Sequence, residues 1–487
     1  MFAHVGRFAA FLLLVAVVGF PVPASACDEL IARSSFWVRL SAPVSSFTAK
    51  RGTIVRAILL ESPQCEGVPV LPTRIPVEGR VLSVHRVGLG LWHETAALEI
   101  AFVRLTPPDS APIQINARVK VVDNARESVR NGVIHGIRST DTPQGMISSR
   151  LKYLPSLHLY PDPYLLGYKM LFPIFPEPEI NLEVGTDIEV ELAETAKLPD
   201  DLAPVPRLPV IADYAEIDRG LAGLPERTLT KKGKDADVVN IVFAGSRDEL
   251  EEAFKAAGWF QSRPASPHTV MRQFYAYLSR SSYANAPMTT QLLEGRKADL
   301  TLEKVFQSNE KRNHLRIWSL QYTWDGLPLW ASAAVRETGA TFSVRHKGFI
   351  HHVSEDLDEE QETIVRDLAI AGCVDSVGTI ARPDVDHVLR NATGEYFRTT
   401  GSLEIIRVKP CKLDPADVGG SHVKNGSWRY RYLRREILTV RSDLLRANCI
   451  YGLFDLTRTA ISAVRQNYSR RAVAEEFRQE VELAHGK

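Results

Sequence analysis

Residues 238–249 read Val238-Val239-Asn240-Ile241-Val242-Phe243-Ala244-Gly245-Ser246-Arg247-Asp248-Glu249. The apolar run, which only Asn240 interrupts, predicts a short buried strand that ends at Gly245. Ser246 is followed three residues later by Glu249, and this spacing is a capping box that predicts the start of a helix. Apolar residues continue at helical spacing until Gly258. This domain therefore opens as a strand, a tight turn and a helix.

The segments that follow predict a mixture of strands and helices. Strand-like apolar runs recur at 315–322, 329–335 and 403–408, and a long amphipathic helix is expected over 357–371. Strands and helices mixed along one segment favour an α/β or α+β layer arrangement.

The residues before this domain have a different pattern, with turns at Pro and Gly between short runs. The runs are rich in β-branched residues or alternate in polarity, and they are Ile54–Leu60, Val81–Val87, Ala97–Phe102 and Ile113–Val119. Several short strands at this spacing predict a barrel or a sandwich. Gly52 and Gly185 each precede a strand, and we expect those two strands to be neighbours where the sheet closes.

We expect a multidomain α+β protein with an N-terminal β-barrel or sandwich-like domain and a C-terminal α/β domain. The predicted parts are a signal peptide (1–26), a β-rich domain (27–195), a Pro-rich linker (196–225), the α/β domain (226–415) and a basic helical tail (416–487). Prolines stiffen the linker, which makes it the clearest boundary. An aromatic, Pro-rich stretch at 154–179 predicts an ordered loop on the sheet.

The first residues have the pattern of a secretory signal. An apolar run from Phe8 to Phe20 is followed by small residues, which predicts cleavage between Ala26 and Cys27. The run is shorter than the ~20 residues that span a bilayer. An uncleaved anchor and lipidation of Cys27 are the alternatives. We expect an exported protein that is periplasmic or membrane-associated.

The cysteines agree with export, which permits disulfides. There are 5 cysteines, and none are spaced Cys-x-x-Cys, which argues against a zinc–thiolate site. Cys373 and Cys411 flank one segment and can form a disulfide, although two free buried cysteines fit the sequence equally well.

Charge is balanced over the whole chain but not along it. The 487 residues hold 59 Lys and Arg against 58 Asp and Glu, which gives no field for binding nucleic acid. The segment 421–487, by contrast, has 13 basic and 7 acidic residues. This segment is either a solvated helix packed on a domain or a peripheral contact with an anionic membrane surface.

Several short motifs together carry a family resemblance. They stand at 240–246, 253–259, 283–288, 312–318, 326–330 and 351–360. With these motifs, residues 225–410 resemble the C-terminal domain named after LssY, a bacterial protein assigned to type I secretion. Glu360 departs from the family pattern, which has arginine there, and the block 394–401 lacks the usual Asp before its last glycine. The resemblance implies work at the cell envelope with an envelope or membrane protein partner, and no established activity.

One region is dense in side chains that can bind metals or anions. It contains His314, His351, His352, Asp356, Asp358 and Glu359. Imidazoles and carboxylates bind zinc and other divalent cations, and they can also place a general base beside a water molecule. The adjacent residues 351 and 352 point to opposite faces of a strand, so only one can enter a given site. Arg316 and Arg296 can add an anion-binding side to such a cleft.

A structural interpretation competes with this site. Asp356 can cap the helix that follows it, and Glu359 favours the positive end of the helix dipole. Arg296 can belong to a turn network with Asp299.

Motifs of several enzyme classes are absent from the sequence. It contains no phosphate-binding loop, dinucleotide fingerprint or Gly-x-Ser-x-Gly elbow. We therefore expect an exported envelope protein that binds or holds a partner in secretion or transport, without an assigned cofactor. The alternative is a metal-dependent hydrolase acting on phosphoesters, with His314, His352 and Asp356 as ligands or base.

Overall fold

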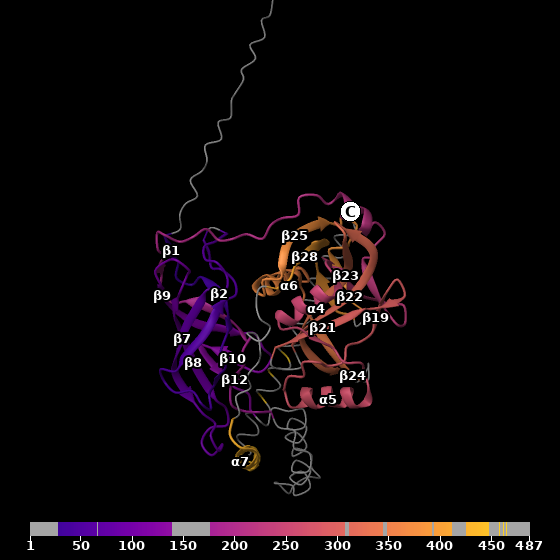
Figure 1. The fold of residues 1–487 in the computed structure, drawn as a ribbon. Coiled ribbons are helices and arrows are strands. Elements are labelled where there is room, and N and C mark those ends of the chain that lie inside the picture. The colour runs from indigo at the N-terminus through magenta and orange to yellow at the C-terminus, as the bar shows by residue number, and fades with distance from the viewer. Residues whose placement is uncertain are drawn as a thin grey trace, which may run out of the picture.

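The computed structural model describes residues 28–65, 67–138, 176–306, 311–343, 348–391, 394–411 and 425–447, with Thr457, Ile461 and Val464 besides. The predicted signal peptide, the aromatic stretch up to residue 175 and most of the tail beyond 447 lie outside these residues. Figure 1 shows two domains side by side, a β-domain in indigo and purple and a second domain in magenta and orange.

Six strands close the N-terminal domain into a barrel. Their order is β8 (Ala97–Leu105), β7 (Pro76–His85), β4 (Ile54–Leu59), β2 (Ser35–Leu40), β13 (Asp187–Leu192) and β9 (Ile113–Val122), and β9 pairs back with β8. All of these pairings are antiparallel. The alternation predicted from sequence for residues 113–119 places Ile113, Ile115 and Val119 of β9 inside the barrel. The barrel, rather than the sandwich, is the architecture that forms.

Short strands extend the barrel or pair beside it. The pairs are β10 (Ser128–Arg130) with β11 (Val133–His135), β12 (Asn181–Leu182) with β3 (Val44–Ser45), β1 (Glu29–Leu30) with β14 (Ala196–Lys197), and β5 (Gln64–Cys65) with β6 (Val68–Pro69). Of these, β11 also pairs with β8 and so joins the barrel sheet.

Gly52 and Gly185 both stand in turns that lead into barrel strands. Each has a φ of +85°, a left-handed conformation that glycine adopts without steric cost. The expectation that their strands are neighbours is wrong, because β2 lies between β4 and β13. The similar segments after Gly52 and Gly185 share the same kind of turn, and the kind of turn does not determine which strand pairs with which.

A mixed sheet forms the core of the second domain. Its order is β18 (Phe260–Gln261), β21 (Leu300–Val305), β22 (Arg312–Trp324), β23 (Leu327–Ser343), β17 (Ile241–Ala244), β28 (Ser402–Val408) and β25 (Val374–Ala381), with β24 (Gly348–Val353) paired to β23. Only β17 and β28 are parallel among these described pairs.

Smaller sheets stand beside this core. One has the order β16 (Asp235–Val238), β15 (Arg227–Thr230), β19 (Gln291–Leu293) and β20 (Arg296–Lys297), and the other pairs β26 (Val388–Arg390) with β27 (Tyr396–Arg398). A further helix, α5 (Pro267–Leu278), begins at a second capping box (Figure 1).

Helices cover both faces of the central part of this sheet. On one face, α4 (Arg247–Ala256) and α6 (Asp358–Ile370) pack against Ile241 and Phe243. On the other face, Ile217 of α3 (Ala215–Leu221) packs against Val242 and Ala244. The strand is apolar throughout because both of its faces are covered. The multidomain α+β fold expected from the sequence is confirmed, although the sheet of this domain is mostly antiparallel and not the parallel sheet of an α/β domain.

The opening strand–turn–helix motif is present with one difference. Ser246 accepts a hydrogen bond from the Glu249 amide, and the Glu249 carboxylate accepts one from the Ser246 amide, which completes the capping box. The apolar run forms two strands, β16 and β17, instead of one. Between them, the Asn240 side chain bonds both the amide and the carbonyl of Ala334, in addition to the backbone bond from the Asn240 amide to the Ser332 carbonyl.

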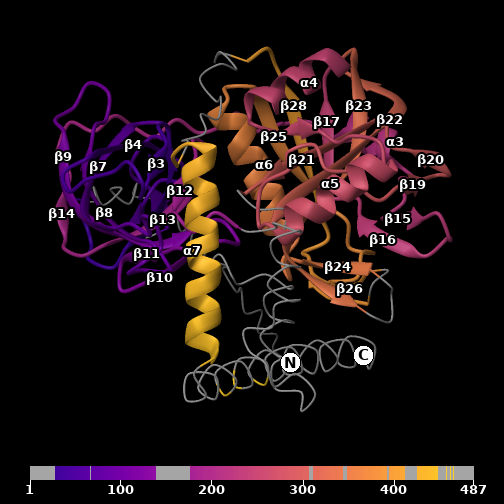
Figure 2. The ribbon, with the colours of Figure 1, turned by 90° about the horizontal axis from the view of Figure 1, so that it is seen from below.

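The tail begins with α7 (Trp428–Ala447), which lies against the barrel (Figure 2). Leu438 enters the barrel core, and Arg434 pairs with Glu177 and lies 3.7 Å from Glu179. None of the described helices is both long enough and apolar enough to cross a membrane. A disulfide joins Cys373 to Cys411, with Cα atoms 4.2 Å apart.

Candidate functional site

Asp367 lies at the centre of the contact between the two domains. This fully buried residue of α6 accepts hydrogen bonds from Lys304 Nζ at 2.6 Å, Trp259 Nε1 at 3.2 Å and Arg39 Nη2 at 2.9 Å. Arg39 comes from the barrel strand β2, where both carboxylate oxygens of Asp187 hold its guanidinium at 2.6 and 2.7 Å. Charges from both domains therefore meet in one buried network, which we call the Asp367 network.

The members of the Asp367 network set one another's ionisation. Burial alone would raise the pKa of Asp367, but the charges of Lys304 and Arg39 lower it below its ordinary value. Burial and the nearby Arg39 lower the pKa of Lys304, although Asp367 and Asp187 oppose them. Lys304 is therefore the cation of this network that loses its proton first as the pH rises.

A second ionic contact joins the domains at Asp123, just after the barrel strand β9. Arg336 of β23 donates to both Asp123 oxygens at 2.8 Å, and Lys311 forms a further ion pair with the same carboxylate. Burial opposes ionisation of Asp123, but Lys311 and Arg336 outweigh it and lower the pKa. The barrel is thus held to the second domain at two buried acids, Asp367 and Asp123.

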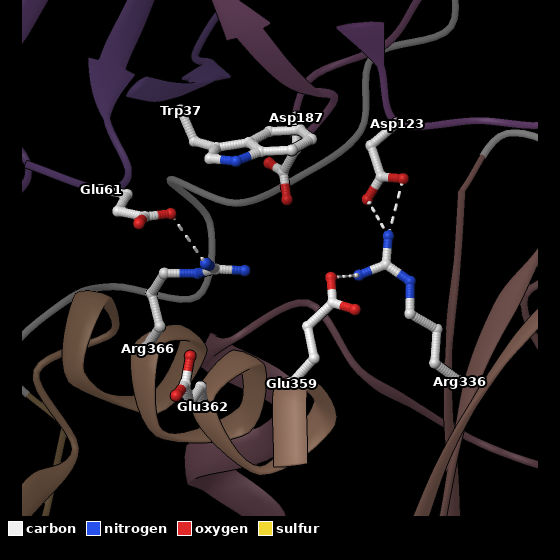
Figure 3. A pocket seen from close by; sticks show the side chains of 8 residues that line it. All are labelled: Trp37, Glu61, Asp123, Asp187, Arg336, Glu359, Glu362 and Arg366. Atoms are coloured by element: carbon white, nitrogen blue, oxygen red, sulfur yellow. Dashed lines mark hydrogen bonds and ion pairs between the residues drawn. The ribbon is translucent and has the colours of Figure 1, made fainter. Parts of the chain in front are cut away.

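A cleft of about 400 Å³ lies between these two contacts (Figure 3). Its lining combines one indole, two guanidinium groups and five carboxylates, from Trp37, Glu61, Asp123, Asp187, Arg336, Glu359, Glu362 and Arg366. The two domains face each other across it, with Arg366 of α6 3.3 Å from Glu61 of the barrel domain. Within the second domain, Arg336 lies 3.8 Å from Glu359. Burial and the nearby Glu61 raise the pKa of Glu362. A cleft between domains is a common place for ligands to bind.

Two buried polar residues beside this interface have unsatisfied side chains. Neither Glu360 oxygen and neither polar atom of the Asn313 side chain has a hydrogen-bond partner among the described residues. Burial raises the pKa of Glu360 well above its ordinary value, although Arg336 opposes this. A neutral carboxyl group is therefore expected at the position where the resembling family has arginine.

The predicted site residue His314 belongs to a different buried cluster, which lies on β21, β22 and β23. His314 Nδ1 lies 3.1 Å from Glu337 Oε1, and its Nε2 lies 3.8 Å from Glu303 Oε2. Arg312 bridges the two carboxylates at 3.2 and 3.0 Å. Burial lowers the pKa of His314 to about 4, and burial also raises that of Glu303 to about 8. Near neutral pH both side chains are consequently uncharged.

The two predicted arginines have structural partners. Arg316 Nη1 binds Asp237 Oδ2 at 2.8 Å and is buried on the same strand as His314. Arg296 Nη2 donates to the Ser319 carbonyl at 2.9 Å, and Asp299 accepts from the Ser319 amide at 2.8 Å. Arg296 and Asp299 therefore meet at one strand residue.

The remaining predicted residues gather at β24 and at the start of α6. His352 pairs with Glu395, while the side chain of His351, on the same strand, is not described. Asp356 accepts from the first amides of α6, at 2.9 and 3.4 Å, which is a capping arrangement. Asp358 binds the Thr399 hydroxyl at 2.7 Å and the Thr400 amide at 2.8 Å.

The structure does not join the predicted residues into one metal centre. Within the described ranges, no group of three or more His, Cys, Asp and Glu side chains is arranged to hold a metal ion. Glu359 alone of the predicted set lines the interdomain cleft. The residues that sequence reasoning missed are Arg39, Lys304 and Asp367. A signal for one of them exists, because Asp367 lies in the buried stripe of α6 beside Ile364 and Leu368.

Comparisons with known proteins support the resemblance found in the sequence. Residues 221–403 match the family described as the LssY C-terminus, which confirms the predicted family for that part of the chain. The chain matches no curated protein. Among solved structures, ComB10 of the Com type IV secretion system of Helicobacter pylori aligns with 37% of this chain and 94% of its own, at 11% identity. The TM-score of 0.21 is too low to support an argument from that likeness.

Proposed function

We propose that this protein, whose residues 221–403 match the LssY C-terminus family, is an exported cell-envelope component that holds a partner in a secretion- or transport-associated complex. The observation that carries the proposal is the Asp367 network, in which Arg39 of the barrel is buried against Asp367 of the second domain. The network supports a binding or scaffold role, because it fastens two domains in one orientation.

The physical reason lies in the geometry that the buried charges require. Asp367 and Arg39 meet across the domains, and each is held in place within its own domain by a second partner, Lys304 and Asp187 respectively. Apolar contacts alone tolerate sliding, whereas an arginine that donates to both oxygens of one carboxylate, as Arg336 does to Asp123 across the two domains, requires one geometry. The cleft is then a surface of fixed shape that both domains build.

Other observations support an envelope location. The pattern of residues 1–26 predicts export, and the Cys373–Cys411 disulfide is a bond that persists in oxidising compartments. The family is named after a secretion component, which favours a partner in the envelope. Lipidation of Cys27 would add a membrane anchor and belongs to the same proposal.

The metal-dependent hydrolase receives no support from a described contact. His314 is engaged by Glu337, His352 by Glu395, and Asp356 by helix amides. We therefore develop only the binding role.

The location of the protein is tested first. Cells that produce the chain are fractionated, and each fraction is treated with a reagent that adds mass to every free thiol, so that a disulfide shows as thiols that do not gain mass. An exported protein should appear outside the cytoplasm with Cys373 and Cys411 protected until a reductant is added. A cytoplasmic protein with reactive thiols would contradict the proposed export.

The binding role is tested with a photo-crosslinking residue at Glu362, an exposed position in the cleft. A matched variant carries the same residue at Tyr322, which is 51% exposed on β22 and contacts the α3 side of the domain. A discrete adduct with an envelope protein should form from position 362 and not from 322. Equal labelling from both positions, or none from 362, would contradict a partner at the cleft.

A further inference from the structure

The helix α7 has an exposed face that is both aromatic and basic. Trp428, Tyr432 and Leu433 are 68%, 50% and 50% exposed. Arg429 lies on the same side, and Arg431, seven residues before Leu438, lies at its edge. Both are exposed, and no acidic partner is found for either in the described part of the chain. The helix holds six arginines and two acidic residues. This composition is typical of helices that lie in the interface of a membrane.

The opposite face of α7 fixes how the helix lies. Leu438 is 1% exposed and part of the barrel core, and the Tyr430 ring lies 5.7 Å from that of Phe47. Arg434 is buried and pairs with Glu177. These contacts use up the inner face, so the helix cannot turn its Trp428 side inwards without leaving the barrel.

A second helix with exposed apolar residues, α5, lies on the same side of the molecule. On α5, Val270, Met271 and Tyr275 are 51%, 55% and 48% exposed, at a spacing that places them together on one helix surface. Both α5 and α7 lie at the lower side of the protein in Figure 1, and both are visible from below in Figure 2. Each domain thus contributes one helix to this side.

We propose that the exposed face of α7, with α5 beside it, docks on the surface of an anionic lipid bilayer. Tryptophan and tyrosine favour the boundary between headgroups and acyl chains, and arginine is attracted to anionic headgroups. The positive charge of the α7 arginines favours an anionic membrane over a second copy of this chain as the partner, because two copies of α7 would bring the same arginines together. Docking of this kind needs no membrane-spanning helix. It adds a membrane surface to the proposed envelope role, and the identity of that membrane rests on the proposed function.

The test is co-sedimentation of the purified full chain with vesicles that contain phosphatidylglycerol, and with vesicles of phosphatidylcholine alone. The variant Arg429→Glu/Arg431→Glu should weaken binding to the anionic vesicles by at least about tenfold. Its control is Arg33→Glu/Arg207→Glu, which makes the same charge change at exposed positions. Arg33 follows β1, which lies at the upper side of Figure 1, away from α7, and Arg207 lies in the linker. The control should bind like the wild type.

A second pair of variants tests the apolar part of the proposal. Trp428→Ser/Tyr432→Ser should also weaken binding, and Tyr322→Ser, at an exposed tyrosine elsewhere, should not. Equal loss in both charge variants would show a general effect of net charge and overturn the assigned face. Unchanged binding in both α7 variants, Arg429→Glu/Arg431→Glu and Trp428→Ser/Tyr432→Ser, would also overturn it. So would a dimer of the wild type in sedimentation that Trp428→Ser/Tyr432→Ser abolishes. Because purified protein is used, failure here leaves the proposed export and cleft partner to their own tests.

Discussion

Asparagine in place of Asp367 removes the charge at the centre of the interdomain contact while keeping the shape of the side chain. Asp367 is fully buried and accepts hydrogen bonds from Lys304 at 2.6 Å and from Arg39 at 2.9 Å. In the variant, Arg39 keeps Asp187, but Lys304 retains no ion pair among the described residues. An uncompensated buried charge costs about 3–5 kcal/mol, and we expect a loss of stability in this range.

The assay is urea unfolding, followed by the fluorescence of tryptophan, since Trp259 contacts Asp367 directly. Glu251→Gln is the control, because Glu251 forms an exposed ion pair with Arg247 on α4. Pairs of this kind contribute about 0.3–0.5 kcal/mol. Limited proteolysis of the linker gives a second readout, and the Asp367 variant should be cleaved faster because the domains separate more often.

A compensating variant separates charge from shape. In Asp367→Leu/Lys304→Met both charges are gone, and replacing a buried ion pair by apolar residues is often neutral. This double variant should recover a large part of the stability that Asp367→Asn loses. A loss below about 1 kcal/mol in Asp367→Asn, or a double variant less stable than the single one, would contradict the account of this network.

Three further predictions follow from local contacts. Burial raises the pKa of Glu303 to about 8 in the folded protein, so the free energy of unfolding that its protonated form contributes falls as the pH rises from 4.5 towards 8. The free energy of unfolding of Glu303→Gln should therefore depend less on pH than that of the wild type between about pH 6.5 and 8. Parallel pH curves for the two proteins would count against a raised pKa. Gly90→Ala would place a Cβ 2.5 Å from Leu438, in a backbone with φ of +84°, and should loosen α7, measured as faster proteolysis after residue 428; unchanged cleavage would show that α7 is not held there. Ser246→Ala removes the capping box of α4 and should cost about 1 kcal/mol in thermal or urea unfolding, with Ser246→Asp restoring most of it.

Local features of the fold could be predicted because their causes are local. The capping box at Ser246 and Glu249 uses atoms three residues apart, and it forms as predicted. Gly52 and Gly185 mark turns because their backbone conformation favours glycine whatever surrounds them. Alternation along β9 predicts one buried face, which any closed sheet supplies.

The candidate site could be predicted only in part. The density of imidazoles and carboxylates near His314 and Asp356 is real, but the side chains have separate partners. Glu359 reaches the cleft because α6 begins at the interface, which the sequence of the helix does not encode. A carboxylate looks the same in a sequence whether it caps a helix, binds a cation or lies exposed.

The sequence by itself determined the barrel strands apart from β2, the strand–turn–helix opening, the helix of the tail and the family of residues 221–403, since each depends on short-range periodicity or motifs. Only the tertiary structure decided the partners of Asp367 and the placement of α7. Arg39 and Asp367 are 328 positions apart, and their attraction becomes strong only when docking of the two domains removes water from both. Burial of that kind is a property of the assembled surfaces, and no single segment carries it.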